Sequence, residues 1–210
     1  LLEGQVSATA AAYAARAALA HAVELSVPRL EAGGRLIYLG AGTSGRIAAL
    51  DAAELPPTFG WPAERALAIM AGGEAAFFRA VEGAEDDGQA AVASLGELNL
   101  SPQDVVIGLA ASGRTPFVAE GLTYARKVGA LALAISSNPE GPVGARADVS
   151  IVADTGAETI AGSTRMRAGT AQKALLTCFS TAVLVRLGYV YRGRMVEMRP
   201  TNFKLQDRAA

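Results

Sequence analysis

The chain has 210 residues, 51% of them hydrophobic, and a formal net charge of −1 at pH 7. These values predict one sizeable core, and a balanced charge without a basic run argues against nucleic acid or an anionic membrane surface as partner. A single cysteine, Cys178, excludes an intrachain disulfide, and we expect it to be buried. The sequence shows no apolar stretch long enough to span a membrane and no leader pattern, so we expect a cytoplasmic protein.

The first expected element is an alanine-rich helix over 5–31, which Pro28 bends or breaks and Gly33-Gly34 ends. Short β-rich runs follow, separated mostly by helical segments, at about 35–40, 66–70, 104–110, 130–136 and 149–153. A last long helix is expected over 163–187. This alternation indicates an α/β fold: a three-layer, doubly wound, five-stranded parallel sheet with an added N-terminal helix.

We expect a single domain over 1–210. Within it, 1–32 form the N-terminal helical segment and 33–188 the sheet with its covering helices. Residues 189–210 form a C-terminal extension that we expect to continue in the full-length protein.

Two loops have the composition of a phosphate cradle. The first follows an apolar run and opens a helix, with Gly42, Thr43 and Ser44 at the turn. A helix N-terminus presents free backbone N–H groups, which bind anions. The second follows the run that ends near residue 110, and it carries Ser112, Gly113, Arg114 and Thr115 before Pro116 at a helix start. In a doubly wound sheet both loops would lie at the switch point in strand order, and two such loops suggest a phosphorylated ligand.

A third polar cluster, 154–165, opens the long helix. Ser163 or Thr164 could cap this helix and leave N–H groups and hydroxyls for an anion, and Glu158 lies close enough to contact a sugar hydroxyl. A capping role alone is the simpler interpretation. Lys173, further along the helix, is expected to be structural or to lie behind the site.

The carboxylates give two candidates for acid and base chemistry. Pro56-Pro57 should stop the helix that begins near Ser44, which places Glu54 in its last turn, where the helix dipole favours the protonated acid. Residues 82–87 hold four carboxylates, and crowding could poise one of them as a base. Ordinary solvated residues at a helix end and in a loop remain the alternatives.

Other chemistries find no support in the sequence. The sole histidine, His21, lies in the N-terminal helix far from these loops, so imidazole catalysis and a histidine metal site are not expected. The first loop has no lysine where a nucleotide-binding P-loop requires one. No set of Cys, His and carboxylate residues has the spacing of metal ligands.

Taken together, the motifs closely resemble the N-acetylmuramic acid 6-phosphate etherase family, within the wider group of sugar isomerase (SIS) domains. They occur in order over most of the chain: GAGTSGR at 40–46, LDAAELPPT at 50–58, VEGAED at 81–86, ASGRTP at 111–116 and GSTRM at 162–166. The resemblance implies a flavodoxin-like SIS fold. It also implies cleavage of the D-lactyl ether of N-acetylmuramic acid 6-phosphate, giving N-acetylglucosamine 6-phosphate and D-lactate in cell-wall recycling. The resemblance implies neither a metal nor an organic cofactor.

By the same matching, Glu54 resembles the family's acid that protonates the lactyl oxygen. Glu85 resembles its second catalytic glutamate, which we assign to the C2 proton. The residues implied to hold the phosphate or nearby hydroxyls are Ser44, Ser112, Thr115, Ser163 and Thr164.

Helix geometry predicts how this site is built. Glu54 lies on the order of 15 Å from Ser44 at ~1.5 Å per residue, a gap that a hexose phosphate barely covers. We therefore expect a homodimer in which Glu54 of one subunit meets a sugar phosphate held by the other. Two alternatives remain open: an aldose-ketose phosphosugar isomerase, and a non-catalytic sugar-phosphate-sensing regulator.

Overall fold

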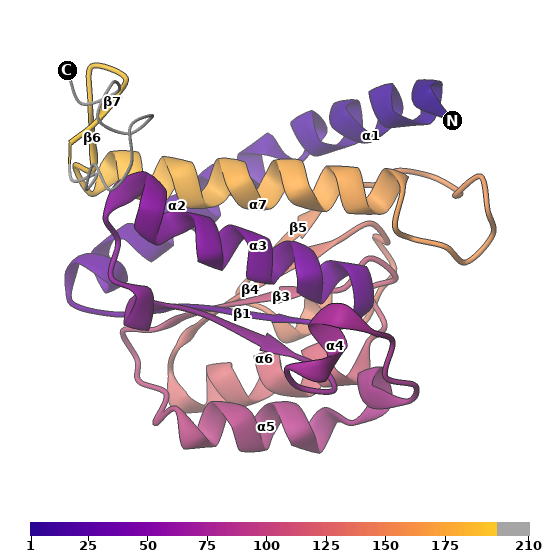
Figure 1. Ribbon diagram of the computed structural model, residues 1–210, viewed down its shortest axis with the longest axis horizontal. Helices are drawn as coiled ribbons and strands as arrows, with labels where there is room; N and C mark the ends of the chain where they lie inside the picture. The colour runs from indigo at the N-terminus through magenta and orange to yellow at the C-terminus, as the bar shows by residue number, and fades with distance from the viewer. Residues whose placement is uncertain (197–210) are drawn as a thin grey trace.

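The computed structural model describes residues 1–196, and Figure 1 shows their arrangement in layers. A parallel sheet of five strands in the order β2-β1-β3-β4-β5 lies at the centre. Its strands are β1 (Leu36–Gly40), β2 (Ala66–Met70), β3 (Val105–Leu109), β4 (Leu131–Ser136) and β5 (Val149–Val152). Each strand falls within a β-rich run of the sequence, and the predicted doubly wound α/β sheet is confirmed.

Helices cover both faces of the sheet (Figure 1). One face carries α5 (Gly88–Glu97) and α6 (Pro116–Val128). The other carries α2 (Arg16–Glu31), α3 (Gly42–Phe59) and α7 (Arg167–Arg186), with α1 (Leu2–Ala14) packed on α7. The three inner strands β1, β3 and β4 are buried along their whole length, which is why their sequences are continuously apolar.

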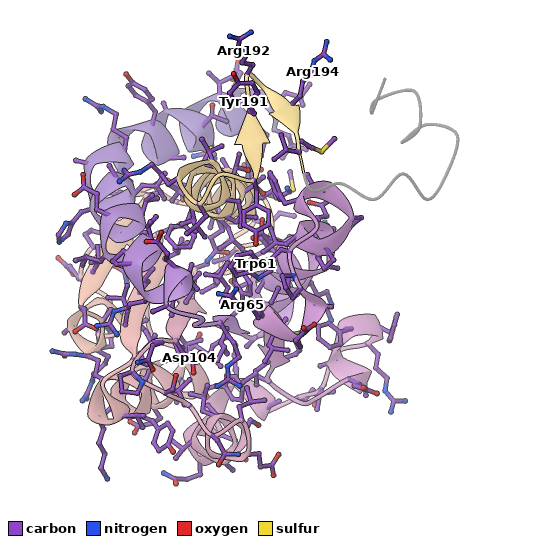
Figure 2. All side chains as sticks on the ribbon, turned by 90° about the vertical axis from the view of Figure 1, so that its left-hand side faces the viewer. Trp61, Arg65, Asp104, Tyr191, Arg192 and Arg194 are labelled. Carbon is purple, nitrogen blue, oxygen red and sulfur yellow. The ribbon has the colours of Figure 1, made fainter. Side chains whose placement is uncertain are left out.

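The remaining elements are short. The helical turns are α4 (Ala75–Phe78), η1 (Ala63–Arg65), η2 (Ala84–Asp86) and η3 (Gly144–Arg146). A two-stranded antiparallel hairpin, β6 (Val190–Tyr191) and β7 (Arg194–Met195), follows α7. In Figure 2 its Arg192 and Arg194 extend away from the body of the molecule. Of the predicted extension 189–210, residues 197–210 lie outside the described part of the chain.

The prediction of one N-terminal helix interrupted at Pro28 is wrong. The segment forms two helices, α1 and α2, which meet at Ala15, and Pro28 stands inside the last turn of α2. A proline there removes only one intrahelical hydrogen bond, and burial of Leu30, which is 1% exposed, holds the turn in place. The helical segment ends before Gly33, whose positive φ of 97° confirms the predicted stop.

The prediction that Pro56-Pro57 stops the third helix is also wrong. Helix α3 continues through both prolines to Phe59 and ends at Gly60, which has a left-handed φ of 70°. Leu55 and Phe59 are buried on the core side of this last turn. Their burial contributes about 3 to 6 kcal/mol, which offsets much of the cost of roughly 3 kcal/mol for each of the two prolines inside the helix. Glu54 therefore lies more than one turn before the helix end.

Helix α7 corrects three expectations. It begins at Arg167, four residues later than predicted. By length and composition it could cross a membrane, contrary to our expectation for this chain, but 56% of its most apolar window is buried against the core. The prediction that Cys178 is buried is wrong, because the thiol lies on an exposed face of α7 in a groove shared with Tyr13 and Leu19.

A buried ion pair ties the amino ends of β1 and β3 together. Asp104 is 1% exposed and accepts hydrogen bonds from the Arg35 guanidinium, at 2.7 Å and 3.0 Å, and from the backbone N–H groups of Arg35 and Ser101. Burial opposes the charge on Asp104, but the hydrogen bonds from Arg35 and Ser101 outweigh it and lower the pKa of this carboxyl.

A second arginine acts at the same edge, where Figure 2 shows Asp104, Arg65 and Trp61. Arg65 donates to the Gly34 carbonyl at 2.7 Å, and its guanidinium stacks 4.1 Å from the centre of the Trp61 ring. The amino edge of the sheet is thus closed by side-chain hydrogen bonds.

We predict that Asp104→Asn lowers the free energy of unfolding by about 3 to 5 kcal/mol, because it removes the charge that pairs with Arg35 and replaces one acceptor oxygen by an NH2 group that faces donors. Because the folded pKa of Asp104 lies below its ordinary value of 3.8, its contribution is present above that pH and is lost as the pH falls through the folded pKa. Urea unfolding at several pH values measures both effects.

The matched control is Asp148→Asn, which breaks the more exposed pair with Arg126. We expect a loss of about 1 kcal/mol or less there. Equal losses in the two variants, at every pH, would contradict the role given to Asp104.

Candidate active site

The first cradle forms where β1 runs into α3. Helix α3 begins at Gly42, directly after the extended residue Ala41, and no side chain of the described part of the chain caps its N-terminus. The first N–H groups of a helix have no partner within the helix, so those of Gly42, Thr43 and Ser44 can bind an anion. This is the arrangement that the sequence predicted.

Two glycines let the helix approach the strand this closely. A Cβ atom on Gly40 would lie 2.7 Å from the Gly45 Cα, and one on Gly45 would lie 2.8 Å from the Gly40 carbonyl oxygen and 2.2 Å from the Met70 sulfur. Any side chain at these positions would push the first turn of α3 off the end of β1. The position of the cradle therefore depends on close backbone contact.

The second cradle follows β3. Gly113 adopts a left-handed φ of 67°, and Thr115 precedes Pro116 at the start of α6 without a side-chain cap. The Ser112 hydroxyl accepts a hydrogen bond from the Arg114 N–H at 3.2 Å. Asn138, from the loop after β4, braces this turn by donating to the Ser112 carbonyl oxygen at 2.9 Å.

Both cradles leave the sheet at the same edge. Gly40, the last residue of β1, pairs in register with Leu109, the last residue of β3. The strand order reverses between these two strands, since β2 lies on one side of β1 and β3 on the other. The loops therefore flank the topological switch point, where doubly wound sheets bind ligands.

A cavity of about 330 Å³ lies beside the first cradle. It is lined by Gly42 and Arg46 of α3 and by Glu82 and Glu85 of the acidic run. Arg46 fixes its wall by donating to the carbonyl oxygens of Ala76 at 2.8 Å and Phe77 at 3.1 Å. The structure thus brings Glu85 to the cradle, although Glu85 and Gly42 are far apart in sequence.

The acidic run divides into two roles. Asp87 caps helix α5, because its carboxylate accepts a hydrogen bond from the Ala90 N–H at 3.0 Å. For Asp87 the ordinary interpretation as a residue at a helix N-terminus is therefore correct. Glu82 and Glu85 instead face the cavity on either side of Gly83, which has a left-handed φ of 72°.

The start of α7 lies against the first cradle, with a different cap from the one predicted. Ser163 and Thr164 precede the helix and do not cap it. The Glu158 carboxylate does so, by accepting hydrogen bonds from the N–H groups of Arg167 and Ala168, both at 3.1 Å. A carboxylate satisfies two N–H groups and the helix dipole together, which a hydroxyl cannot do.

The 163–169 segment nevertheless approaches the cradle. A Cβ atom on Gly169 would lie 3.6 Å from both the Thr164 carbonyl oxygen and the Thr43 methyl group. In this structure the Glu158 carboxylate accepts hydrogen bonds from the backbone of α7. Ligand contact therefore stays a prediction for Glu158, as it does for Ser163 and Thr164.

Glu54 stands apart from the residues around the cavity. It does not line the cavity that holds Gly42 and Glu85. Its side chain is 52% exposed, and the Lys173 ammonium lies 3.8 Å from its carboxylate. Ser44 and Glu54 lie on one continuous helix, which keeps them about 15 Å apart.

A buried polar cluster lies behind Glu54. Asp51, only 2% exposed, accepts hydrogen bonds from the Tyr38 hydroxyl at 2.9 Å and the Ser180 hydroxyl at 3.1 Å. Burial raises the pKa of Asp51, and the hydrogen bonds from Tyr38 and Ser180 oppose this rise. Thr177 lies 3.3 Å from Asp51 and accepts a hydrogen bond from the Lys173 ammonium at 2.7 Å. Lys173 thus links the Glu54 carboxylate to the buried cluster around Asp51, and its role behind a catalytic site stays a prediction.

Sequence reasoning missed Asp51, Arg46 and Gln172 as parts of this region. Gln172 accepts a hydrogen bond from the Ser44 hydroxyl at 2.9 Å. Arg46 stood within the first loop motif, and Asp51 is a carboxylate on the apolar face of a helix, so both had a local signal. Gln172 had none, because its partner lies on a helix far away in sequence.

Comparison with known proteins places this site in a class. Residues 18–126 match the family model of the glucokinase regulatory protein N-terminal SIS domain, and residues 86–182 match that of the SIS domain. A phosphoheptose isomerase from Francisella tularensis superposes with a TM-score of 0.64 at 17% identity, covering 87% of this chain and 93% of that one. The NanR protein of Vibrio vulnificus, solved in complex with ManNAc-6P, superposes with a TM-score of 0.59 at 18% identity, covering 88% and 62%. The chain is a SIS-domain protein.

Curated relatives narrow the class to one family. An N-acetylmuramic acid 6-phosphate etherase from Deinococcus radiodurans is 50% identical over 209 residues, which are 100% of this chain and 68% of the relative. Another from Pectobacterium atrosepticum is 54% identical over 192 residues, which are 91% and 63%. The chain belongs to the N-acetylmuramic acid 6-phosphate etherase family, and it spans about two thirds of the length of these relatives.

We predict that Gly45→Ala destabilises the fold by about 1 to 3 kcal/mol, because the new methyl group collides with the Gly40 backbone as well as with Met70. Denaturant unfolding measures the change. Gly96→Ala is the control: the nearest atom to its new methyl group is 3.7 Å away, and alanine favours a helix, so no loss is expected. An unchanged stability of Gly45→Ala would contradict the close-contact account of the cradle.

Proposed function

We propose that the protein of which this chain is part cleaves the D-lactyl ether of N-acetylmuramic acid 6-phosphate, giving N-acetylglucosamine 6-phosphate and D-lactate in cell-wall recycling. Family membership supports the substrate class. The observation that carries the reaction is the placement of Glu85 on the cavity beside the helix N-terminus at Gly42. An anion bound at that N-terminus leaves its sugar within reach of a carboxylate. The reaction belongs to cytoplasmic metabolism.

The reaction proceeds by elimination and addition. In the open-chain sugar, the aldehyde acidifies the proton at C2, and a base removes it. The C2 electron pair forms a double bond to C3 as the C3–O bond to lactate breaks, and an acid protonates the departing oxygen. Water then adds its hydroxyl to C3 and a proton to C2, which restores the saturated sugar. The chemistry thus needs a base at the C2 proton and an acid at the oxygen on the neighbouring carbon, C3.

We assign the base at C2 to Glu85 and the acid at the lactyl oxygen to Glu54. Glu85 is on the cavity with the cradle, where the sugar carbons next to the aldehyde can reach it. The phosphate is assigned to the first cradle together with Ser112 and Thr115, which leave the sheet at the same edge. The hydroxyls of Ser163 and Thr164 come from the segment next to Thr43.

We further propose that the active site is shared across a homodimer. Glu54 does not line the cavity of its own chain, and α3 keeps it about 15 Å from Ser44. Leu50, one turn before Glu54 on the same helix, is 46% exposed. An apolar side chain on that face favours contact with a second copy, which would bring Glu54 to the partner's substrate.

We predict that Glu54→Gln lowers the rate of lactate release by a factor of about 100 to 10,000, the usual contribution of a general acid, and leaves binding of N-acetylglucosamine 6-phosphate intact. A coupled lactate assay and calorimetry measure the two quantities. Glu24→Gln, at an exposed position on α2, is the control and should keep full activity. The same assay tests the alternatives: a regulator binds the sugar phosphate without turnover, and an isomerase yields a ketose phosphate without lactate.

The shared site predicts complementation between two inactive variants. Subunits with Glu54→Gln and subunits with Ser112→Ala, unfolded and refolded together, form mixed dimers in which one of the two sites has both residues intact. Random pairing restores about a quarter of the wild-type activity. Each variant refolded alone is the control, and absence of recovery in a mixture shown to contain mixed dimers would overturn the shared site.

A further inference from the structure

Three buried polar atoms have no hydrogen-bond partner within the described residues 1–196. They are the Ser137 hydroxyl, the Arg167 Nε and the Gln172 amide nitrogen. Ser137 directly follows β4 at the carboxyl edge of the sheet, and the other two lie in the first turns of α7. Unpaired buried polar groups cost free energy, so their concentration at one edge marks a place where the protein has not been optimised for stability alone.

Gln172 connects such an atom directly to the first cradle. Its side chain is 1% exposed, and its Oε1 accepts a hydrogen bond from the Ser44 hydroxyl at 2.9 Å. Ser44 is itself 7% exposed and stands in the first turn of α3. The amide nitrogen on the other arm of Gln172 has no acceptor among residues 1–196.

This arrangement uses the only proton of Ser44. A serine hydroxyl donates one hydrogen bond, and here it donates to Gln172. The hydroxyl cannot donate to a phosphate at the same time. If the amide turns by 180° about its last torsion, the nitrogen donates to the Ser44 oxygen and the serine proton becomes free. The two orientations have the same outline, so the turn needs no extra room.

We propose that Gln172 is the positioning residue of the phosphate cradle: its amide nitrogen donates to Ser44 in the complex, and Ser44 then donates its proton to an oxygen of a phosphate monoester held at the N-terminus of α3. This inference rests on the proposed function only in taking a sugar phosphate as the ligand. When the ligand binds, the amide nitrogen gains Ser44 as its acceptor, and the amide oxygen gives up the Ser44 proton to the phosphate. Gln172 therefore acts through Ser44 and makes no contact with the substrate.

Two substitutions at position 172 separate the possible roles. Gln172→Met keeps an unbranched side chain of similar length but removes both the donor and the acceptor. Gln172→Glu keeps the shape and the acceptor but cannot donate when ionised, so it holds the Ser44 proton and adds a negative charge near the phosphate. Ser26→Ala, at a buried serine of α2 that donates a hydrogen bond to the Ala22 carbonyl oxygen, is the matched control.

The experiment is a double-mutant cycle with Ser44→Ala, Gln172→Met and the double variant. The steady-state KM and kcat for lactate release, and calorimetric binding of N-acetylglucosamine 6-phosphate, are measured for each. We expect Gln172→Met to raise KM by about 10-fold to 100-fold with a smaller change in kcat, as for loss of a hydrogen bond to a charged group. In the Ser44→Ala background the same substitution should change KM less than twofold. Gln172→Glu should raise KM at least as much as Gln172→Met.

Stability separates positioning from a purely structural role. Gln172→Met removes the amide nitrogen that has no acceptor within residues 1–196, but it also removes the acceptor of the Ser44 hydroxyl. These two effects oppose each other, so the thermal unfolding midpoint of the ligand-free protein should change little. A fall in this midpoint together with an equal loss of affinity in both backgrounds of the cycle would overturn the proposal. So would a Gln172→Glu variant that binds the sugar phosphate as tightly as the wild type.

Failure of this proposal can be told apart from failure of the proposed function. If the wild-type protein binds the sugar phosphate but releases no lactate, the proposed reaction fails while the cycle, measured on dissociation constants, still decides the role of Gln172. If the wild-type protein binds no sugar phosphate, both proposals fail.

Discussion

The contact between the end of β1 and the first turn of α3 is the constraint on which the rest of the site depends. Gly40 and Gly45 meet backbone to backbone with no room for a Cβ atom on either. This contact sets the helix N-terminus over the carboxyl end of the strand, where its N–H groups can bind an anion. It also fixes the direction of α3, and so the position of Glu54 at the far part of the same helix.

The two ends of the strands have different roles: contacts at the amino edge of the sheet stabilise the fold, and the carboxyl edge carries the candidate site. At the amino edge, Asp104 and Arg35 form a buried pair and Arg65 binds the Gly34 carbonyl, so polar groups there are satisfied by side chains. At the carboxyl edge the loops carry glycine and hydroxyl residues, and unpartnered buried atoms such as the Gln172 nitrogen gather near them. A stable amino edge allows the opposite edge to keep groups that only a ligand would satisfy.

Local pattern was enough to predict much of this. The five strands, the two cradles and the switch point follow from short apolar runs ending in glycine and hydroxyl residues. Reasoning failed where a tertiary contact opposed a local preference: burial of Leu55 and Phe59 carries α3 through two prolines, and Glu158 replaces the expected hydroxyl cap of α7. The prediction that Cys178 is buried failed for the same reason, because tertiary packing decides which side of α7 faces the core.

By itself, the sequence determined the fold class, the family and the residue types of the candidate site, because these depend on periodicity and on motifs within short segments. Only the tertiary structure decided that Glu85 shares a cavity with Gly42, that Glu54 lies outside it, and that Gln172 holds the Ser44 hydroxyl. The physical reason is that a hydrogen bond or a shared cavity depends on distances of a few ångströms between separate elements. Those distances arise only when the helices pack onto the sheet.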